Sequence, residues 1–161
     1  MIVVDVNNEV GFTFSATKLK EVVVELLTDH GIRRGEISLA IIDDQTMHEL
    51  NRRHLQHDYP TDVLSFVLET DGDHLEGEVI VSADTAAQVA PTHDWPVEHE
   101  LTLYVIHGCL HLVNYDDHSD DDRQNMRTKE LHYLARAGIR PSDEQLQGHF
   151  ERIMQRKERT A

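Results

Sequence analysis

The chain has 161 residues, of which 39% are hydrophobic and 28% charged, and this is the composition of one globular domain with a hydrophobic core of its own. Thirty Asp and Glu residues against fifteen Lys and Arg residues give a formal net charge of -15, which argues against a protein that holds nucleic acid by a broad basic surface. Any contact with nucleic acid would have to be local, transient or assisted by a metal ion.

The single cysteine, Cys109, cannot form an internal disulfide, and this suits a reducing cytoplasm. No stretch approaches the roughly 20 apolar residues that a membrane-spanning helix requires. The first residues also lack a basic region followed by a long apolar run, so we expect no signal peptide. We therefore expect a cytoplasmic protein without a membrane partner.

In chain order, the first part of the sequence predicts a strand, a helix and a second strand. Residues 2–6 are apolar and β-branched, which is typical of a strand. Residues 17–30 carry an apolar stripe at helical spacing, and Gly31 is placed to end that helix. Residues 36–42 alternate and then become continuously apolar, which predicts the next strand.

The middle of the sequence predicts a short helix, two strands and another short helix. Thr46 and Glu49 match a capping box, so we expect a helix to begin at Thr46. Residues 63–68 and 78–81 are predicted strands separated by a turn-forming segment that contains glycine. Ser82 is placed to cap the short helix that follows.

The last third of the sequence predicts helices. Pro96 fits the first turn of a helix that continues with few charges until Asn114, a residue that tolerates the left-handed conformation with which helices end. We expect so apolar a helix to be central and buried. A polar helix follows at about residues 119–137 and ends at Gly138, and residues 141–161 are expected to form a charged helical tail.

These elements amount to four strands and four to five helices. Because strands and helices do not alternate strictly, they predict a mixed α+β layer rather than a doubly wound parallel sheet. We expect residues 1–140 to form a single domain, with residues 141–161 as its tail.

The predicted buried helix carries the residues with the clearest chemistry. His107 and His111 are four residues apart, so their side chains lie on one face of the helix, one turn apart, and can bind one zinc ion. The helix stops soon after, so that Asp117 can supply a third ligand, with His118 adjacent to it. Three protein ligands leave a fourth position for water, which is typical of a catalytic zinc site.

The alternative is that this histidine pair arises by chance, because the chain contains twelve histidines. Imidazoles without partners would be costly on an otherwise apolar helix, which favours the metal site. Gly108 stands where the common zinc-protease motif has its glutamate base, so a peptidase of that type is not expected. Cys109 is expected to be a small core residue, and Asp116 to lie at the helix stop rather than on the metal.

At these residues the sequence resembles the YbeY endoribonuclease family, whose motif reads H-G-x-L-H-L-x-G-Y-D-H. The positions that match it are His107, Gly108, Leu110, His111, Leu112, Tyr115 and Asp116. A second family block, P-T-D-V-L-S-F, is intact at residues 60–66, and the resemblance covers about residues 36–137. Within that block Asp62 is read as a structural residue, although it can also line the cleft beside the metal.

The resemblance implies a YbeY-like metal-hydrolase fold, with a mixed four-stranded sheet packed by helices and the metal-binding helix at its centre. It also implies one Zn²⁺ ion, single-stranded ribosomal RNA as substrate, and the ribosome as partner. The implied function is a single-strand-specific endoribonuclease in 16S rRNA 3′-end maturation and ribosome quality control.

The sequence departs from the family motif in the turn after the helix. Asn114 replaces the turn glycine, which a left-handed position tolerates. The third histidine of the family falls in register on Asp117, and His118 comes one residue late. A carboxylate is a legitimate zinc ligand, so we favour Asp117 over His118 as the third ligand.

Another departure concerns the residue expected to stabilise phosphate. Family members usually carry an arginine, implicated in RNA cleavage, five residues before the proline of the second block, and this chain has Leu55 there. Arg52, Arg53 or His57 could take its place as catalytic residues, but each is read equally well as an ordinary surface residue. Two other classes therefore stay open: a metal-dependent hydrolase of another substrate, and a non-catalytic ribosome-associated zinc protein.

Overall fold

A computed structural model describes residues 1–55, 62–142 and 144–145 of the chain. Its elements in chain order are β1 (Ile2–Asn8), α1 (Ala16–Asp29), β2 (Arg34–Ile42), α2 (Asp44–Leu55), β3 (Val63–Asp71), β4 (His74–Ser82), α3 (Ala83–Val89), the 3-10 turn η1 (Ala90–His93), α4 (Val97–Leu112) and α5 (Asp120–Arg136). The predicted α+β fold, with a four-stranded sheet and helices around it, is confirmed. Most of the predicted C-terminal tail lies outside the described residues.

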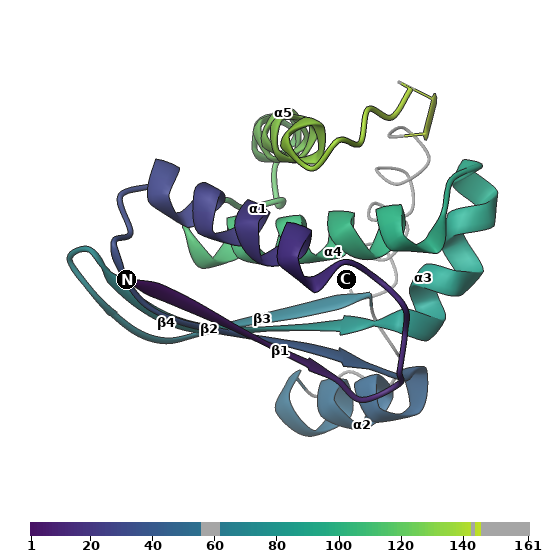
Figure 1. Ribbon diagram of the computed structural model, residues 1–161, viewed down its shortest axis with the longest axis horizontal. Helices are drawn as coiled ribbons and strands as arrows, with labels where there is room; N and C mark the ends of the chain where they lie inside the picture. Colours follow the sequence, from purple (N-terminus) through teal and green to yellow (C-terminus); the bar gives the residue numbers. More distant parts are fainter. Residues whose placement is uncertain (56–61, 143, 146–161) are drawn as a thin grey trace.

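The four strands form one mixed sheet in the order β1-β2-β4-β3. β1, β2 and β4 are parallel, and β3 pairs antiparallel with β4 at one edge. Helices α1 and α4 cover one face of the sheet, α5 lies outside them, and α2 lies on the opposite face (Figure 1). This layering places α4 beside α1 and between the sheet and α5 (Figure 1).

Local signals explain where most of the elements begin and end. Ser82 caps α3 as expected, because its Oγ accepts a hydrogen bond from the backbone of Thr85. Gly31 and Asn114 both adopt positive φ angles, of 84° and 75°, at the ends of their helices. The strands β3 and β4 are longer than predicted, since they continue as a hairpin almost to the tight turn around Gly72, whose φ is 59°.

The predicted start of α2 at Thr46 is wrong. The helix begins two residues earlier, at Asp44, and its cap is Asp43, whose Oδ1 accepts a hydrogen bond from the backbone N–H of Thr46 at 2.7 Å. Aspartate is as good a cap as threonine, so the capping-box motif was one of two competing signals within four residues.

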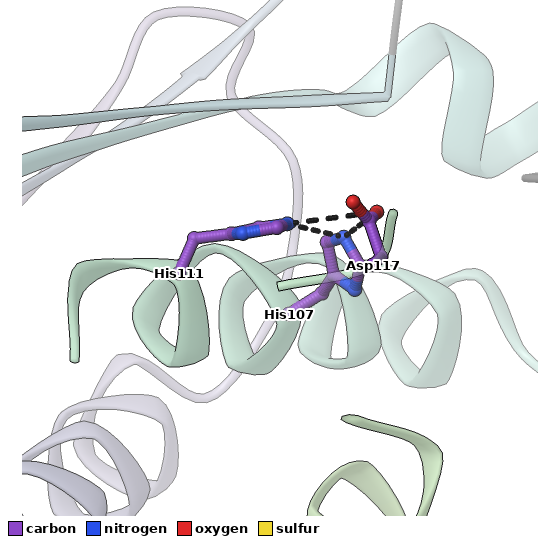
Figure 2. A group of neighbouring side chains, drawn as sticks. All are labelled: His107, His111 and Asp117. Carbon is purple, nitrogen blue, oxygen red and sulfur yellow. Dashed lines mark hydrogen bonds and ion pairs between the residues drawn. The ribbon is translucent and has the colours of Figure 1, made fainter. Parts of the chain in front are cut away.

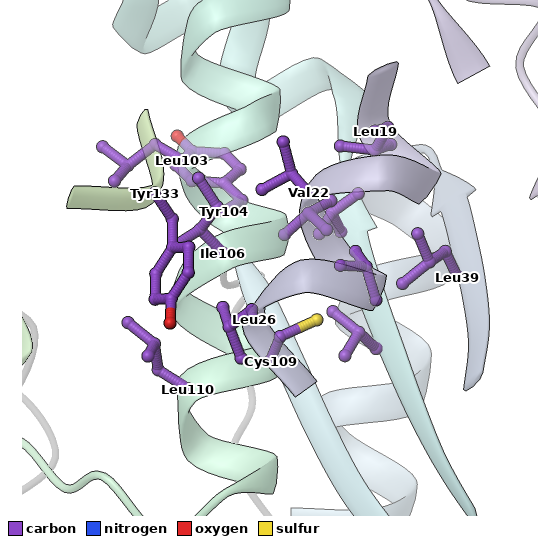
Figure 3. Packing of buried hydrophobic residues seen from close by; sticks show 14 of the residues in the cluster. Leu19, Val22, Leu26, Leu39, Leu103, Tyr104, Ile106, Cys109, Leu110 and Tyr133 are labelled. Carbon is purple, nitrogen blue, oxygen red and sulfur yellow. The ribbon is translucent and has the colours of Figure 1, made fainter. Parts of the chain in front are cut away.

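Helix α4 is buried, as its composition predicts. Every residue from Glu100 to Leu110 is buried, and Leu103, Ile106 and Cys109 pack among side chains of α1, α5 and the sheet (Figure 3). A sequence pattern without a polar face therefore corresponds to a helix covered on all sides. None of the described helices combines the length and the apolar character that a membrane span requires.

Gly108 allows α4 to lie close against the sheet. A Cβ atom at this position would lie 2.6 Å from Cγ1 of Val79 and 2.9 Å from Oγ of Ser65, both closer than side chains tolerate. The Ser65 hydroxyl donates a hydrogen bond to the carbonyl oxygen of Gly108 at 2.9 Å, which fixes this contact. The close packing sets the position of the two neighbouring turns of α4, which carry His107 and His111.

Candidate metal centre

The two histidines of α4 face each other at its C-terminal end. Their Nε2 atoms are 3.1 Å apart (Figure 2). Helix α4 stops at Leu112, and Asn114 in its left-handed conformation turns the chain back toward the helix. The backbone N–H of Tyr115 then donates to the carbonyl oxygen of Leu110 at 3.0 Å, which closes the turn and directs the following residues toward the imidazoles.

Asp117 completes a group of three possible ligands. Its Oδ2 lies 3.7 Å from Nε2 of His107 and 3.7 Å from Nε2 of His111. Ligand atoms of a tetrahedral zinc ion are about 3.3–3.5 Å from one another when each bond is about 2.0–2.1 Å long. The three separations in this structure, 3.1, 3.7 and 3.7 Å, bracket that value, so the group could hold a metal ion.

Hydrogen bonds on the far side of both rings aim their lone pairs at this point. Nδ1 of His107 donates to Oε1 of Glu130 at 2.8 Å, and Nδ1 of His111 donates to the carbonyl oxygen of Tyr115 at 3.0 Å. Carboxylate and carbonyl oxygens only accept, so the ring protons are on Nδ1. A ring whose only proton is on Nδ1 presents the lone pair of Nε2 toward the carboxylate of Asp117, an arrangement that favours a cation between the three.

The electrostatic surroundings of His107 also favour positive charge. Burial alone lowers the pKa of His107, but the hydrogen bond to Glu130 and the negative charges of Glu130, Asp62 and Asp117 outweigh it, so that the net pKa is raised. The side chains of His107, Asp117 and His111 are 7%, 14% and 29% exposed. The group is therefore sheltered on the side of His107 and accessible beside His111.

The structure separates the two candidates for the third ligand. Asp117 points at the imidazoles, whereas the side chain of His118 is 77% exposed and pairs with Asp116, with 3.1 Å between Nε2 and Oδ1. The geometry thus brings together His107, His111 and Asp117 and leaves His118 outside the group.

Of the three catalytic candidates, the two arginines on α2 are not brought to this group. Arg52 and Arg53 are exposed on α2, which packs on the sheet face opposite α4. His57 lies outside the described residues. A catalytic role for any of the three stays a prediction.

Two buried carboxylates lie near His107; the sequence did not point to Glu130, and it left Asp62 open between a structural role and the cleft beside the metal. Glu130 is 23 residues away on α5 and is 3% exposed, and Asp62 is 5% exposed just before β3. The backbone carbonyl oxygen of Asp62 accepts a hydrogen bond from the backbone N–H of Ser82, and a structural role for its side chain stays a prediction. Its charge also acts on His107, and no local spacing in the sequence connects these positions.

The fold and the site together define an α+β protein with a His–His–Asp group that could hold a metal ion on its central helix. Comparison with known proteins gives this class a family. The sequence profile of the family described as Endoribonuclease YbeY matches residues 5–138. The chain belongs to the YbeY family, which confirms the resemblance seen in two motifs and extends it toward the N-terminus.

Individual relatives agree with this assignment. A protein of Rhodopirellula baltica named Endoribonuclease YbeY is 41% identical over 125 residues, which cover 76% of this chain and 64% of that protein. One of the same name from Salinibacter ruber is 40% identical over 127 residues, covering 74% of this chain and 81% of the relative. The solution structure of TM1509 from Thermotoga maritima matches with a TM-score of 0.59 and 28% identity, over 85% of this chain and 89% of TM1509.

Proposed function

We propose that this protein is a zinc-dependent, single-strand-specific endoribonuclease that acts in 16S rRNA 3′-end maturation and in ribosome quality control. Membership of the YbeY family and the name of its relatives, Endoribonuclease YbeY, support the nuclease activity. One observation carries the metal-dependent part: the lone pairs of His107 and His111 converge with the carboxylate of Asp117, while both distal ring nitrogens are held by acceptors.

The choice of zinc rests on the chemistry of the donor set. Two imidazole nitrogens and one carboxylate oxygen suit Zn²⁺, whereas Mg²⁺ prefers oxygen ligands and keeps most of its water. A zinc ion bound there supplies Lewis acidity, which lowers the pKa of water and polarises a phosphoryl oxygen. Asp117 in place of a third imidazole neutralises part of the charge of the ion, a difference that moderates this acidity.

The residues of the chain then have separate tasks. His107, His111 and Asp117 hold the ion, and Glu130 fixes the ring of His107 through its Nδ1–H group. Because His111 is the most exposed of the three ligands, RNA would approach from its side. The net charge of -15 limits RNA contacts to this local region, where the cation offsets the repulsion between the acidic protein and the phosphates.

The test is a cleavage assay with the full chain loaded with zinc. We expect it to cut a single-stranded RNA internally, to leave the same sequence in a duplex intact, and to lose activity with a chelator or in His111→Ala. Casein serves as the competing substrate, because cleavage of casein and not of RNA would show a hydrolase of another class. Inactivity toward both substrates at full zinc loading would contradict the proposal and favour a non-catalytic zinc protein.

The ribosomal role is tested separately. We propose a cytoplasmic location because the proposed substrate is ribosomal RNA. Zinc-loaded protein added to precursor ribosomal particles should shorten the 3′ end of 16S rRNA, and the His111→Ala variant should not. Cleavage of free RNA without any effect on particles would overturn the ribosomal assignment and leave the nuclease assignment standing.

A further inference from the structure

One arginine is attached to the loop that carries the third ligand. Arg123 lies in the first part of α5, and its side chain is only 10% exposed. Its Nη1 donates to the carbonyl oxygens of Asp117 and His118, at 3.2 and 3.1 Å. Its Nη2 pairs with the carboxylate of Asp120. The guanidinium therefore holds two successive peptide groups of the loop at once.

These two peptide groups decide which side chain faces the metal centre. Asp117 and His118 are consecutive, and the structure directs the first toward the imidazoles and the second into solvent, where it pairs with Asp116. Both side chains contain zinc-ligating atoms, so chemistry alone does not choose between them. The choice depends on the orientation of the backbone, which the two hydrogen bonds from Arg123 fix.

We propose that Arg123 is a positioning residue of the metal centre, which holds the backbone of residues 117 and 118 so that Asp117 faces His107 and His111. This inference rests on the proposed metal-dependent function. It assigns Arg123 no contact with substrate, because both of its Nη groups are engaged, by the loop and by Asp120, and its side chain is only 10% exposed.

The sign of the effect separates this role from a charge effect. A positive side chain near a cation site weakens metal binding by repulsion, so removal of the charge alone would strengthen the binding of zinc. A positioning role predicts the reverse, a loss of zinc affinity of about 10- to 100-fold in Arg123→Ala, the range seen when outer supports of metal ligands are removed. Lys129→Ala is the matched control, because it removes one positive charge from the same helix.

The experiment is a double-mutant cycle on the full chain. Zinc affinity is measured by competition with a chromogenic chelator for the wild type, Arg123→Ala, Asp117→Ala and the double variant. We expect Arg123→Ala to lower zinc affinity by at least about 10-fold when Asp117 is present. In the Asp117→Ala background the same substitution should lower it by less than about 3-fold, because the arginine acts through that ligand. Equal losses in both backgrounds would overturn the inference.

A spectroscopic measurement detects a change in the metal ligands, and a conservative variant replaces the alanine variant if that variant does not fold. With Co²⁺ in place of zinc, the visible bands of Arg123→Ala should move away from those of the wild type, toward those of Asp117→Ala or of a site in which His118 has replaced it. Arg123→Lys keeps the charge without the planar fork and should shift in the same direction. It provides the test if the alanine variant fails to fold by circular dichroism. Unchanged affinity together with unchanged bands would overturn the inference.

The outcomes distinguish this inference from the proposed function. A wild-type protein that binds no zinc would overturn both. A wild type that binds one equivalent, with Arg123→Ala equal to Lys129→Ala in affinity and spectrum, would overturn the role of Arg123 and leave the proposed function standing.

Discussion

The two histidines of the candidate metal centre and its carboxylate are supported by different parts of the molecule. His107 and His111 project from α4, which is buried among the sheet, α1 and α5 and is held close to the sheet at Gly108. Asp117 projects from a short loop on the surface, where Asp116 and His118 are exposed. The spacing of the imidazoles follows from helix geometry, whereas the position of the carboxylate depends on contacts with α5.

This difference teaches that one site can combine a rigid and an adjustable part. The helical pair cannot change its spacing without unfolding a buried helix. The loop has no such regular geometry and is held by contacts with α5, at a position where this chain has an aspartate and its family motif has a histidine.

The largest effect is expected on the helical side. In His111→Ala the affinity for zinc should fall by about 1,000-fold or more, because one of the two imidazole ligands on the helix is removed. Its folding should change little, since the side chain is 29% exposed. His107→Ala should also lose zinc, but with a further loss of about 1–3 kcal/mol of stability, because the buried Glu130 loses its donor.

The measurement is the zinc content after dialysis together with thermal unfolding of the metal-free proteins. Retention of one zinc ion per chain in both variants would show that His107 and His111 are not zinc ligands.

The loop side is tested by comparing two neighbouring variants. Asp117→Ala should weaken zinc binding by about 100-fold or more, because one ligand of three is lost. His118→Ala should change it by less than about 2-fold, because this exposed side chain points away from the centre. Competition titrations with the same chelator give both values, and the reverse order would identify His118 as the ligand.

A smaller effect is expected at the support of His107. In Glu130→Gln the amide oxygen can still accept from Nδ1, so the ring keeps its orientation but loses the negative partner that makes it a stronger ligand. We expect zinc affinity to fall by about 10-fold, toward the lower end of the range for such supports. Asp121→Asn, an exposed carboxylate on the same helix, is the control and should leave the affinity unchanged within error.

The smallest effect is expected in how folding stability depends on pH. His107 should contribute to this dependence with one sign in the metal-free protein, and zinc binding with the opposite sign in the zinc-bound protein. The raised pKa of His107 stabilises the metal-free fold fully below its unfolded pKa of about 6.5, and this contribution is lost as pH rises through the folded pKa. Zinc competes with that proton, so the stabilisation by zinc should grow over the same rise in pH.

Thermal unfolding with a chelator and with zinc, at about pH 6 and pH 8, measures both slopes. His107→Gln supplies the reference for the other titrating groups of the chain. A wild type with the same slope as this variant in the metal-free state would contradict the assignment.

The same contrast explains how much of the molecule could be predicted. Helix α4, its burial and its histidine pair follow from local spacing and composition, and the stop at Asn114 follows from its tolerance of the left-handed conformation. The third ligand stayed open between Asp117 and His118, because a loop has no period that tells which of two neighbours points inward. Tertiary contacts decide it.

The supporting residues were beyond prediction for the same reason. Glu130 and Asp62 reach His107 from α5 and from the start of β3, and Arg123 reaches the loop from α5. These contacts exist only after the helices have packed, and no spacing in one sequence encodes them.

The most direct test of the central claim is the X-ray absorption spectrum of the zinc-loaded wild type. Two imidazoles and a carboxylate predict a four-coordinate ion, with two imidazole nitrogens and the remaining ligands oxygen, all at about 2.0–2.2 Å. His111→Ala should lack the signature of the imidazole pair. Three imidazoles around the zinc, a sulfur ligand, or an ion without any imidazole would contradict the centre of His107, His111 and Asp117.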